Sequence, residues 1–151
     1  MKISIQACLI AVLLISIYVH AEPEPVNLEK TMKEAAVKAV KTYRKTGMAG
    51  ARIEVEDCYK NVKKRVFYCL YLDFAARHID QLMVAANSFP PQEFFDDKAF
   101  GSRASAIYAS AKMNKSQIND HLKLLVPTIN RFVDEELSEH RFFEEELRQP
   151  K

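Results

Sequence analysis

The sequence predicts an all-α fold, a single compact bundle of about five helices. The chain has 151 residues but only three glycines, and it contains no Asn-Gly turn. Apolar residues recur at spacings of three and four along nearly its whole length. These spacings place side chains on one face of a helix, whereas a half-buried strand would alternate them. We therefore expect helices and no sheet.

The first two helices are expected on either side of a glycine-containing turn. Asn27 is a suitable N-cap for a helix that ends at Gly47. The residues GMAG at 47–50 form the expected turn. Residues 51–62 combine a strand-like alternation with a helical repeat, and we assign them to a helix because no second strand is available for pairing. The apolar face of the first helix consists of Leu28, Met32, Ala35, Ala36, Ala39, Val40 and Tyr43.

Residues 66–88 form the strongest predicted element and the expected centre of the bundle. Their first half, VFYCLYLDFAA, is apolar on nearly every side. A helix of that kind is normally surrounded by other helices. The residues Phe-Pro-Pro at 89–91 should end it, because the residue before a proline disfavours the helical conformation.

Two more helices are predicted after the prolines. Asp96 or Asp97 can cap the first of them, and Ser116 can cap the last. Pro127 lies inside the apolar stripe of the last helix and removes one backbone donor. We expect a kink near residues 123–127 rather than a break.

The first 21 residues are predicted to be a secretory signal. Lys2 precedes an apolar run, and the small residue Ala21 precedes an acidic segment that contains prolines. This pattern is typical of a signal peptide cleaved after Ala21. An uncleaved N-terminal anchor is the alternative, because the run approaches the ~18 apolar residues that can span a bilayer.

Cleavage would leave 130 residues, a usual size for one domain. We expect a flexible leader at 22–27 and a helical domain at 28–147, located in the periplasm or outside the cell without stable membrane association. The mature chain would keep 21 of the 22 basic residues and all 20 acidic ones. That balance gives no electrostatic reason to expect a nucleic-acid partner. The oligomeric state is not predicted.

Cys58 and Cys69 are the only cysteines after the predicted signal. On one straight helix they would lie roughly 16 Å apart, whereas a disulfide needs Cα atoms within about 7 Å. If they are bonded, the chain must fold back at the polar residues 60–65. An exported chain meets oxidising conditions, so we predict a disulfide. A zinc site lacks two further ligands at a suitable spacing, and redox cysteines are usually two residues apart. No metal or other cofactor is predicted.

Asp73 is the most unusual residue, because it places a carboxylate within the apolar segment LYLDFAA. An unpaired buried carboxylate would be costly, so Arg77, His78 or Arg103 should be its partner. We expect a structural role and list Asp73, Arg77 and Arg103 as buried polar residues. A catalytic acid or base is the alternative. Asp80 and Arg77 are otherwise assigned to the solvated side of the same helix.

The sequence contains no GxSxG, HExxH, Walker or dinucleotide-binding motif. The histidines of the mature chain, His78, His121 and His140, lie among charged residues and are expected at the surface. We therefore predict a noncatalytic protein.

Phenylalanines are frequent in two segments where a loop or a terminus is expected. We expect these residues either to pack against the core or to form an apolar contact surface for another protein. The candidates for partner contact are Phe94, Phe95, Phe142 and Phe143.

Three features resemble small periplasmic all-helical proteins of Gram-negative bacteria. They are the cysteine pair around a polar turn, the segment CLYLDFAARHID and a long terminal helix that starts NKSQIND. In layout the chain is similar to the type VI secretion amidase immunity proteins over about residues 28–140. The resemblance implies an exported, compact, cysteine-bearing helical protein that covers a toxin's active site. It assigns no binding residue to this chain.

The function expected from the sequence is binding of another protein, with inhibition of that partner as its consequence. A helical protein that encloses an apolar cavity for a small ligand or lipid is the alternative, suggested by the aromatic content. An enzyme that uses Asp73 is the third candidate.

Overall fold

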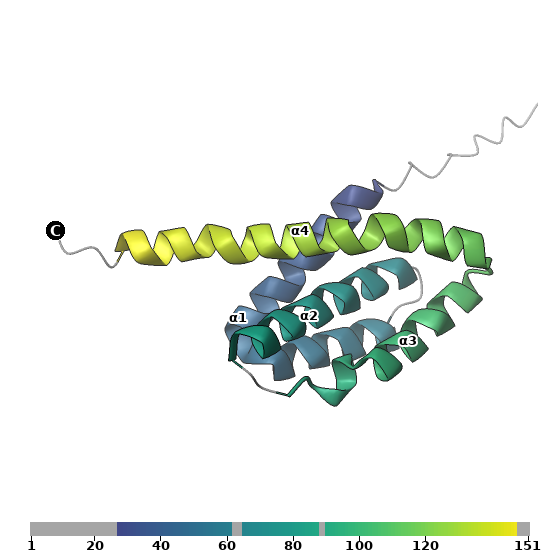
Figure 1. Ribbon diagram of the computed structural model, residues 1–151, viewed down its shortest axis with the longest axis horizontal. Coiled ribbons are helices and arrows are strands. Elements are labelled where there is room, and N and C mark those ends of the chain that lie inside the picture. Colours follow the sequence, from purple (N-terminus) through teal and green to yellow (C-terminus); the bar gives the residue numbers. More distant parts are fainter. Residues whose placement is uncertain (1–26, 62–64, 88–89, 148–151) are drawn as a thin grey trace, which may run out of the picture.

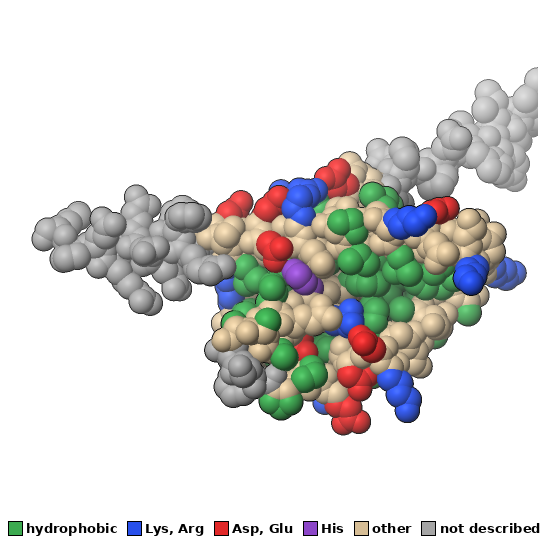
Figure 2. Space-filling model, in the orientation of Figure 1, with side chains coloured by type: hydrophobic (Ala, Val, Ile, Leu, Met, Phe, Trp, Pro, Cys, Tyr) green, Lys and Arg blue, Asp and Glu red, His purple; other side chains and the backbone are tan. Residues whose placement is uncertain are grey.

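A computed structural model describes residues 27–61, 65–87 and 90–147, with side chains described through Glu139 in the last segment. The predicted signal and residues 22–26 of the predicted leader lie outside these ranges. The described chain is all-helical, as predicted. Its elements are α1 (Leu28–Asn61), α2 (Val66–Asn87), the short 3-10 helix η1 (Glu93–Phe95), α3 (Asp97–Ser110) and α4 (Lys115–Leu147). Figure 1 shows the long α4 crossing α1, with α3 running from the side of the bundle opposite α4 up to the start of α4. Figure 2 shows the same face, on which hydrophobic side chains gather between α3 and α4.

The helix count is four in the described chain, so the expectation of about five helices was wrong. The difference lies in α1, a single element made of two helices that meet in a kink at Gly47, where the first helix was predicted to end. Only Gly47 departs from helical geometry, with φ 68° and ψ −170°, and the next three residues are already helical. The expected four-residue turn is therefore a kink at one residue.

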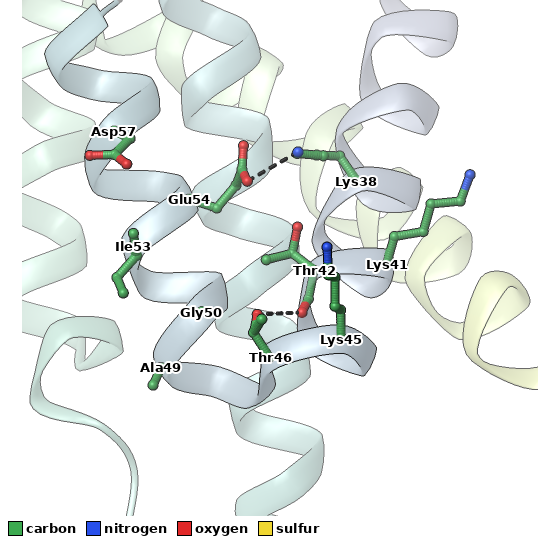
Figure 3. Close-up of a pocket in the computed structure, with 10 residues that line it drawn as sticks. All are labelled: Lys38, Lys41, Thr42, Lys45, Thr46, Ala49, Gly50, Ile53, Glu54 and Asp57. Carbon is green, nitrogen blue, oxygen red and sulfur yellow. Dashed lines mark hydrogen bonds and ion pairs between the residues drawn. The ribbon is translucent and has the colours of Figure 1, made fainter.

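The kink nevertheless reverses the direction of α1. Lys38 Nζ lies 3.0 Å from Glu54 Oε2, although a straight helix would separate residues this far apart by roughly 24 Å. We call residues 28–46 the N-arm and residues 48–61 the C-arm. The two arms face each other across the kink (Figure 3).

Two glycines make this reversal possible. The backbone angles of Gly47 fall in a region that is essentially restricted to glycine. Gly50 has a different reason: a Cβ atom there would overlap the Thr46 side chain. The bend therefore depends on backbone conformation at one glycine and on close approach at the other.

The centre of the bundle is α2, as predicted. Its buried apolar residues include Leu70, Tyr71, Leu72 and Ile79. The N-arm contributes Met32 and a run of small residues, which allow close packing of the helices. Burial of each large apolar side chain contributes about 1.5–3 kcal/mol. Further core residues come from α3 and α4: Phe100, Ala104, Tyr108, Leu125, Ile129, Phe132 and Val133.

The helix starts depend on side-chain caps. Asn27 caps α1 as predicted, because its Oδ1 accepts a hydrogen bond from the Lys30 N–H at 3.0 Å. For α3 the structure selects Asp96, whose Oδ1 accepts from the Ala99 N–H at 2.6 Å.

The prediction of Ser116 as the cap of α4 was wrong. The cap is Asn114, whose Oδ1 accepts from the Gln117 N–H at 3.0 Å, while the Asn114 N–H donates to Gln117 Oε1 at 2.9 Å. This reciprocal pair is a capping box, and it satisfies two backbone donors where Ser116 would satisfy one.

The helix α4 continues without a break past Pro127, as expected, but Figure 1 shows it as one long, nearly straight element without the kink predicted near residues 123–127. Pro127 is exposed, so the carbonyl that loses its helical donor can be hydrated. No helix in the described part of the chain is long and apolar enough to cross a membrane.

Candidate functional site

Asp73 is completely buried in α2 and is held by two partners. Arg103 Nε donates to Oδ2 at 2.8 Å, and Arg103 Nη2 donates to Oδ1 at 2.9 Å. The Tyr59 hydroxyl donates to Oδ2 at 3.1 Å. A two-pronged contact of this kind between arginine and a carboxylate is among the stronger hydrogen-bonded pairs in proteins. Of the three candidate partners, the structure brings Arg103 to Asp73.

The electrostatics of this cluster favour a structural role. Burial raises the pKa of Asp73, while hydrogen bonds from Arg103 and Tyr59 act in the opposite direction. Burial and the neighbouring carboxylate raise the pKa of Tyr59, which keeps its hydroxyl a donor. Among the described residues no buried side-chain polar atom lacks a hydrogen-bond partner. The carboxylate oxygens are thus occupied within the fold.

Three neighbouring charged groups lie in environments other than the predicted ones. Arg77 and Arg103 are not fully buried as predicted, since each keeps 21% of its side chain exposed. Arg77 donates to the Phe95 carbonyl oxygen at 3.2 Å and pairs with Asp97. Asp80 was assigned to the solvated side, yet it is only 4% exposed. The reason is that the chain after α2 turns back, so that the backbone N–H of Gln92 donates to Asp80.

Cys58 and Cys69 are bonded, with Cα atoms 5.6 Å apart. The bridge joins the C-arm of α1 to the start of α2, so the chain folds back between the two cysteines as the sequence required. Tyr59 follows Cys58 directly, and the bridge therefore holds the C-arm where the Tyr59 hydroxyl reaches Asp73. Sequence analysis missed Tyr59 because its contact with Asp73 exists only after this reversal.

The phenylalanines proposed as partner contacts have different environments. Phe95 is 2% exposed, because η1 directs it into the core, so it cannot form a contact surface. Phe94 is half-buried, and the Arg103 guanidinium lies 3.8 Å from its ring centroid. Phe142 and Phe143 lie in α4, but their side chains are outside the described part of the structure.

His121 is half-buried, whereas a surface position was predicted. Its Nε2 lies 3.1 Å from the Tyr71 hydroxyl, and its Nδ1 lies 3.0 Å from the Tyr108 hydroxyl. Phe67 packs edge-on against the imidazole. The pKa of His121 is lowered by burial, which also raises the pKa of Tyr108 to about 12. This cluster joins α2, α3 and α4, and its members are too far apart in sequence to be recognised from spacing.

Of the other two histidines, the structure describes the side chain of one. His78 keeps 15% of its side chain exposed, and its Nε2 lies 3.0 Å from Asp134 Oδ1. The side chain of His140 lies outside the described part.

An open groove lies between the two arms of α1 in the described chain, with a volume of about 650 Å³. Figure 3 shows lysines along the N-arm, and Ile53, Glu54 and Asp57 on the C-arm. Ile53 is 57% exposed, the largest value among the exposed large apolar side chains of the described chain. We call this site the α1 groove. It is lined by Lys38, Lys41, Thr42, Lys45, Thr46, Ala49, Gly50, Ile53, Glu54 and Asp57.

The charges of the α1 groove are only partly balanced. Lys38 pairs with Glu54 across the groove at 3.0 Å, and Asp57 lies 3.4 Å from Lys60. Neither Lys41 nor Lys45 has an acidic partner within 4.0 Å in the described structure. The local charge that is left without a partner is therefore positive. Nothing in the sequence marked this site, since its two walls meet only through the kink.

The described residues contain no group of three or more histidine, cysteine or acidic side chains placed to hold a metal ion. Comparisons of the chain with protein-family models, with curated proteins and with solved structures found no match.

Proposed function

We propose that this chain is an exported, noncatalytic helical protein that binds another protein through the α1 groove and thereby inhibits it. The observation that carries this proposal is the exposure of Ile53 in the wall of an open groove. Single exposed apolar residues are common on protein surfaces. Ile53 differs because it lines a concavity whose other wall carries lysines that have no acidic partner in the described chain.

Ile53 has the properties of a binding anchor. Burying an isoleucine side chain against a partner contributes about 1.5–3 kcal/mol. Residues that dominate binding usually lie near the centre of an interface, where surrounding contacts exclude water. The walls of the α1 groove provide such surroundings. Ala49 lies one turn before Ile53 and extends the apolar part of the C-arm.

The groove is held in shape before any partner arrives. Gly47 sets the bend, the Lys38–Glu54 pair bridges the two arms, and the disulfide fixes the end of the C-arm on α2. A preformed site loses less conformational entropy on binding, which favours affinity. This rigidity supports a recognition surface.

The chemistry of the groove favours binding over catalysis. Its lining has lysine, threonine and two carboxylates, both of which pair with lysines. It has no histidine or cysteine to act as base or nucleophile. The disulfide fits an oxidising compartment and so supports export. Inhibition follows from the resemblance in layout to immunity proteins.

The test is capture of partners from the exported fraction of the source cell, identification by mass spectrometry and titration of each purified candidate by calorimetry. The decisive variant is Ile53→Asp. Leu124→Asp is a matched control, because Leu124 is 52% exposed but lies on α4 outside the groove. We expect Ile53→Asp to weaken binding about tenfold or more, a loss of at least ~1.4 kcal/mol, and Leu124→Asp to leave it unchanged. Equal effects of the two variants would refute the groove as the contact site.

A second function, binding of a small apolar ligand or lipid, is favoured by a smaller pocket between the starts of α1 and α2. It has a volume of about 370 Å³, within the usual range for ligand sites. Its lining is mainly apolar and aromatic, with one arginine: Leu28, Thr31, Arg65, Val66, Phe67, Tyr68 and Tyr71. Native mass spectrometry of the exported protein would show a copurifying ligand if this second function is correct, and the bare polypeptide mass if it is not.

A further inference from the structure

We infer that the α1 groove recognises an acidic protein segment that also carries an apolar side chain. This inference rests on the proposed function and specifies the chemistry of the partner. The apolar side chain would pack on Ala49 and Ile53 of the C-arm. Its neighbouring carboxylates would pair with Lys41 and Lys45 of the N-arm.

The positive wall of the groove is a regular feature of the N-arm. Lys38, Lys41 and Lys45 follow one another at spacings of three and four, so they lie along one stripe of the helix. Like charges at this spacing repel each other and destabilise a helix. Only Lys38 is neutralised across the groove. A carboxylate from a partner would relieve the repulsion between the other two.

The acidic residues of the opposite wall do not cancel this charge. Glu54 is already paired with Lys38, and Asp57 lies within reach of Lys60. An incoming carboxylate therefore meets two unpaired ammonium groups. An incoming basic segment would have to compete with existing ion pairs for the carboxylates. Charge complementarity thus favours an acidic partner.

The apolar wall makes a peptide a better occupant than a free anion. Phosphate or nucleic acid would satisfy Lys41 and Lys45 but would leave Ile53 exposed. The protein as a whole also lacks the excess of positive charge that nucleic-acid binding requires, since its formal net charge is only +2. A segment with both carboxylates and an apolar side chain uses both walls.

The experiment measures fluorescence anisotropy of a labelled synthetic peptide made of leucine and glutamate in an amphipathic helical pattern. The same peptide with glutamine in place of glutamate is the neutral probe, and a single-stranded oligonucleotide is the probe for a general anion site. The protein variants are Lys41→Glu with Lys45→Glu, and Ile53→Asp. The control variant combines Lys115→Glu with Lys123→Glu, which alters the net charge equally but lies on α4.

We expect the acidic peptide to bind the wild-type protein about tenfold more tightly than the neutral one, and more weakly as salt increases. The groove lysine variant and Ile53→Asp should each weaken binding about tenfold or more, while the α4 control changes it less than about twofold. No binding of the acidic peptide, equal loss in the control, or tighter binding of the oligonucleotide would each overturn the inference.

These outcomes distinguish a failure of the inference from a failure of the proposed function on which it rests. If a captured partner loses affinity with Ile53→Asp but the acidic peptide does not bind, only the specificity for an acidic segment is refuted. A partner that binds the Ile53→Asp variant as tightly as the wild type would refute the groove as the contact site, and the inference with it.

Discussion

The Asp73 cluster and the α1 groove both bring charged residues together, but they do so in opposite ways. Around Asp73 every polar group has a partner inside the fold, and the carboxylate has no exposed surface. In the α1 groove two lysines lack an acidic partner in the described structure, and an isoleucine is open to solvent. The polar groups around Asp73 therefore have their partners within the fold. The two lysines and Ile53 of the α1 groove can be paired or buried only by another molecule.

This contrast shows that the residue most conspicuous in the sequence need not mark the functional site. A carboxylate in an apolar helix is conspicuous in the sequence, and it suggests an active site. Its environment favours a structural role instead, because a buried charge is tolerated only when it is paired, and both carboxylate oxygens accept hydrogen bonds within the fold. The lysines and the isoleucine of α1 do not stand out in the sequence, yet they line the α1 groove.

The largest effect should come from breaking the buried pair. Asp73→Ala should reduce the free energy of unfolding by about 3–5 kcal/mol, because it leaves Arg103 and Tyr59 without their acceptor. Urea denaturation measures this loss. The double variant Asp73→Leu with Arg103→Met is the control, and it should recover much of the stability. A fully stable Asp73→Ala protein that has lost an activity would instead favour the catalytic alternative.

The disulfide connects the two regions, so its removal should affect both. Cys58→Ser with Cys69→Ser should lower the free energy of unfolding by about 3 kcal/mol for a loop of this length. Thermal unfolding with and without a reducing agent checks this. Wild-type protein should lose stability on reduction, and the double variant should not respond. A wild-type protein that is insensitive to reduction would contradict the structural role of the bridge.

Changing the kink should alter the groove without touching Asp73. Gly47→Ala forces a residue with a side chain into a glycine-only conformation, and we expect a loss of about 1–3 kcal/mol. No atom would clash with the new Cβ, so the loss should be conformational. Gly101→Ala is a suitable control, because Gly101 has a negative φ and equally free space. Equal destabilisation of both variants in urea denaturation would refute this account.

A smaller effect should come from His121, as pH is lowered. The pKa of His121 is lowered in the folded protein, so the unfolded chain takes up a proton at higher pH, near the ordinary value of about 6.5. Stability should therefore be fully present above that pH and decrease as the pH falls below it.

The groups that face the imidazole are Phe67 and Tyr71 of α2 and Tyr108 of α3, none of which is a charged partner. Comparing unfolding curves of wild type and His121→Gln across this pH range isolates the contribution of His121. An identical pH dependence of the two proteins would show that His121 is not responsible.

The smallest effect on stability should come from the groove residues. Lys41→Glu and Ile53→Asp should each change the free energy of unfolding by less than about 0.5 kcal/mol, because both side chains are exposed and make few contacts. Denaturation curves that overlay the wild-type curve would confirm that binding losses in these variants are local. A large loss of stability would show that the groove is part of the packed structure.

Local features of the sequence were sufficient for much of the fold. The spacing of apolar residues predicted an all-α chain and the central position of α2, because helical periodicity does not depend on the rest of the protein. Asn27 was recognisable as a cap for the same reason. The Cys58–Cys69 bridge was predicted from the pair of cysteines that remains after the predicted signal and from the expected export. The local prediction of a cap at Ser116 failed, because Asn114 with Gln117 makes a better cap. The predicted helix end at Gly47 coincides with the kink, but the turn expected at 47–50 is confined to Gly47, because helical geometry resumes directly after it.

What only the tertiary structure decided is which distant groups meet. The sequence by itself determined that Asp73 needed a partner, but the packing of α3 against α2 selected Arg103 over Arg77 and His78. Packing of α4 against α2 and α3 placed the half-buried His121 between two tyrosines, and the chain that turns back after α2 covered Asp80. The α1 groove depends on the reversal at Gly47, which brings lysines of one arm opposite Ile53 of the other. Such contacts join residues far apart in the chain, so they are set by how helices cross and not by any local pattern.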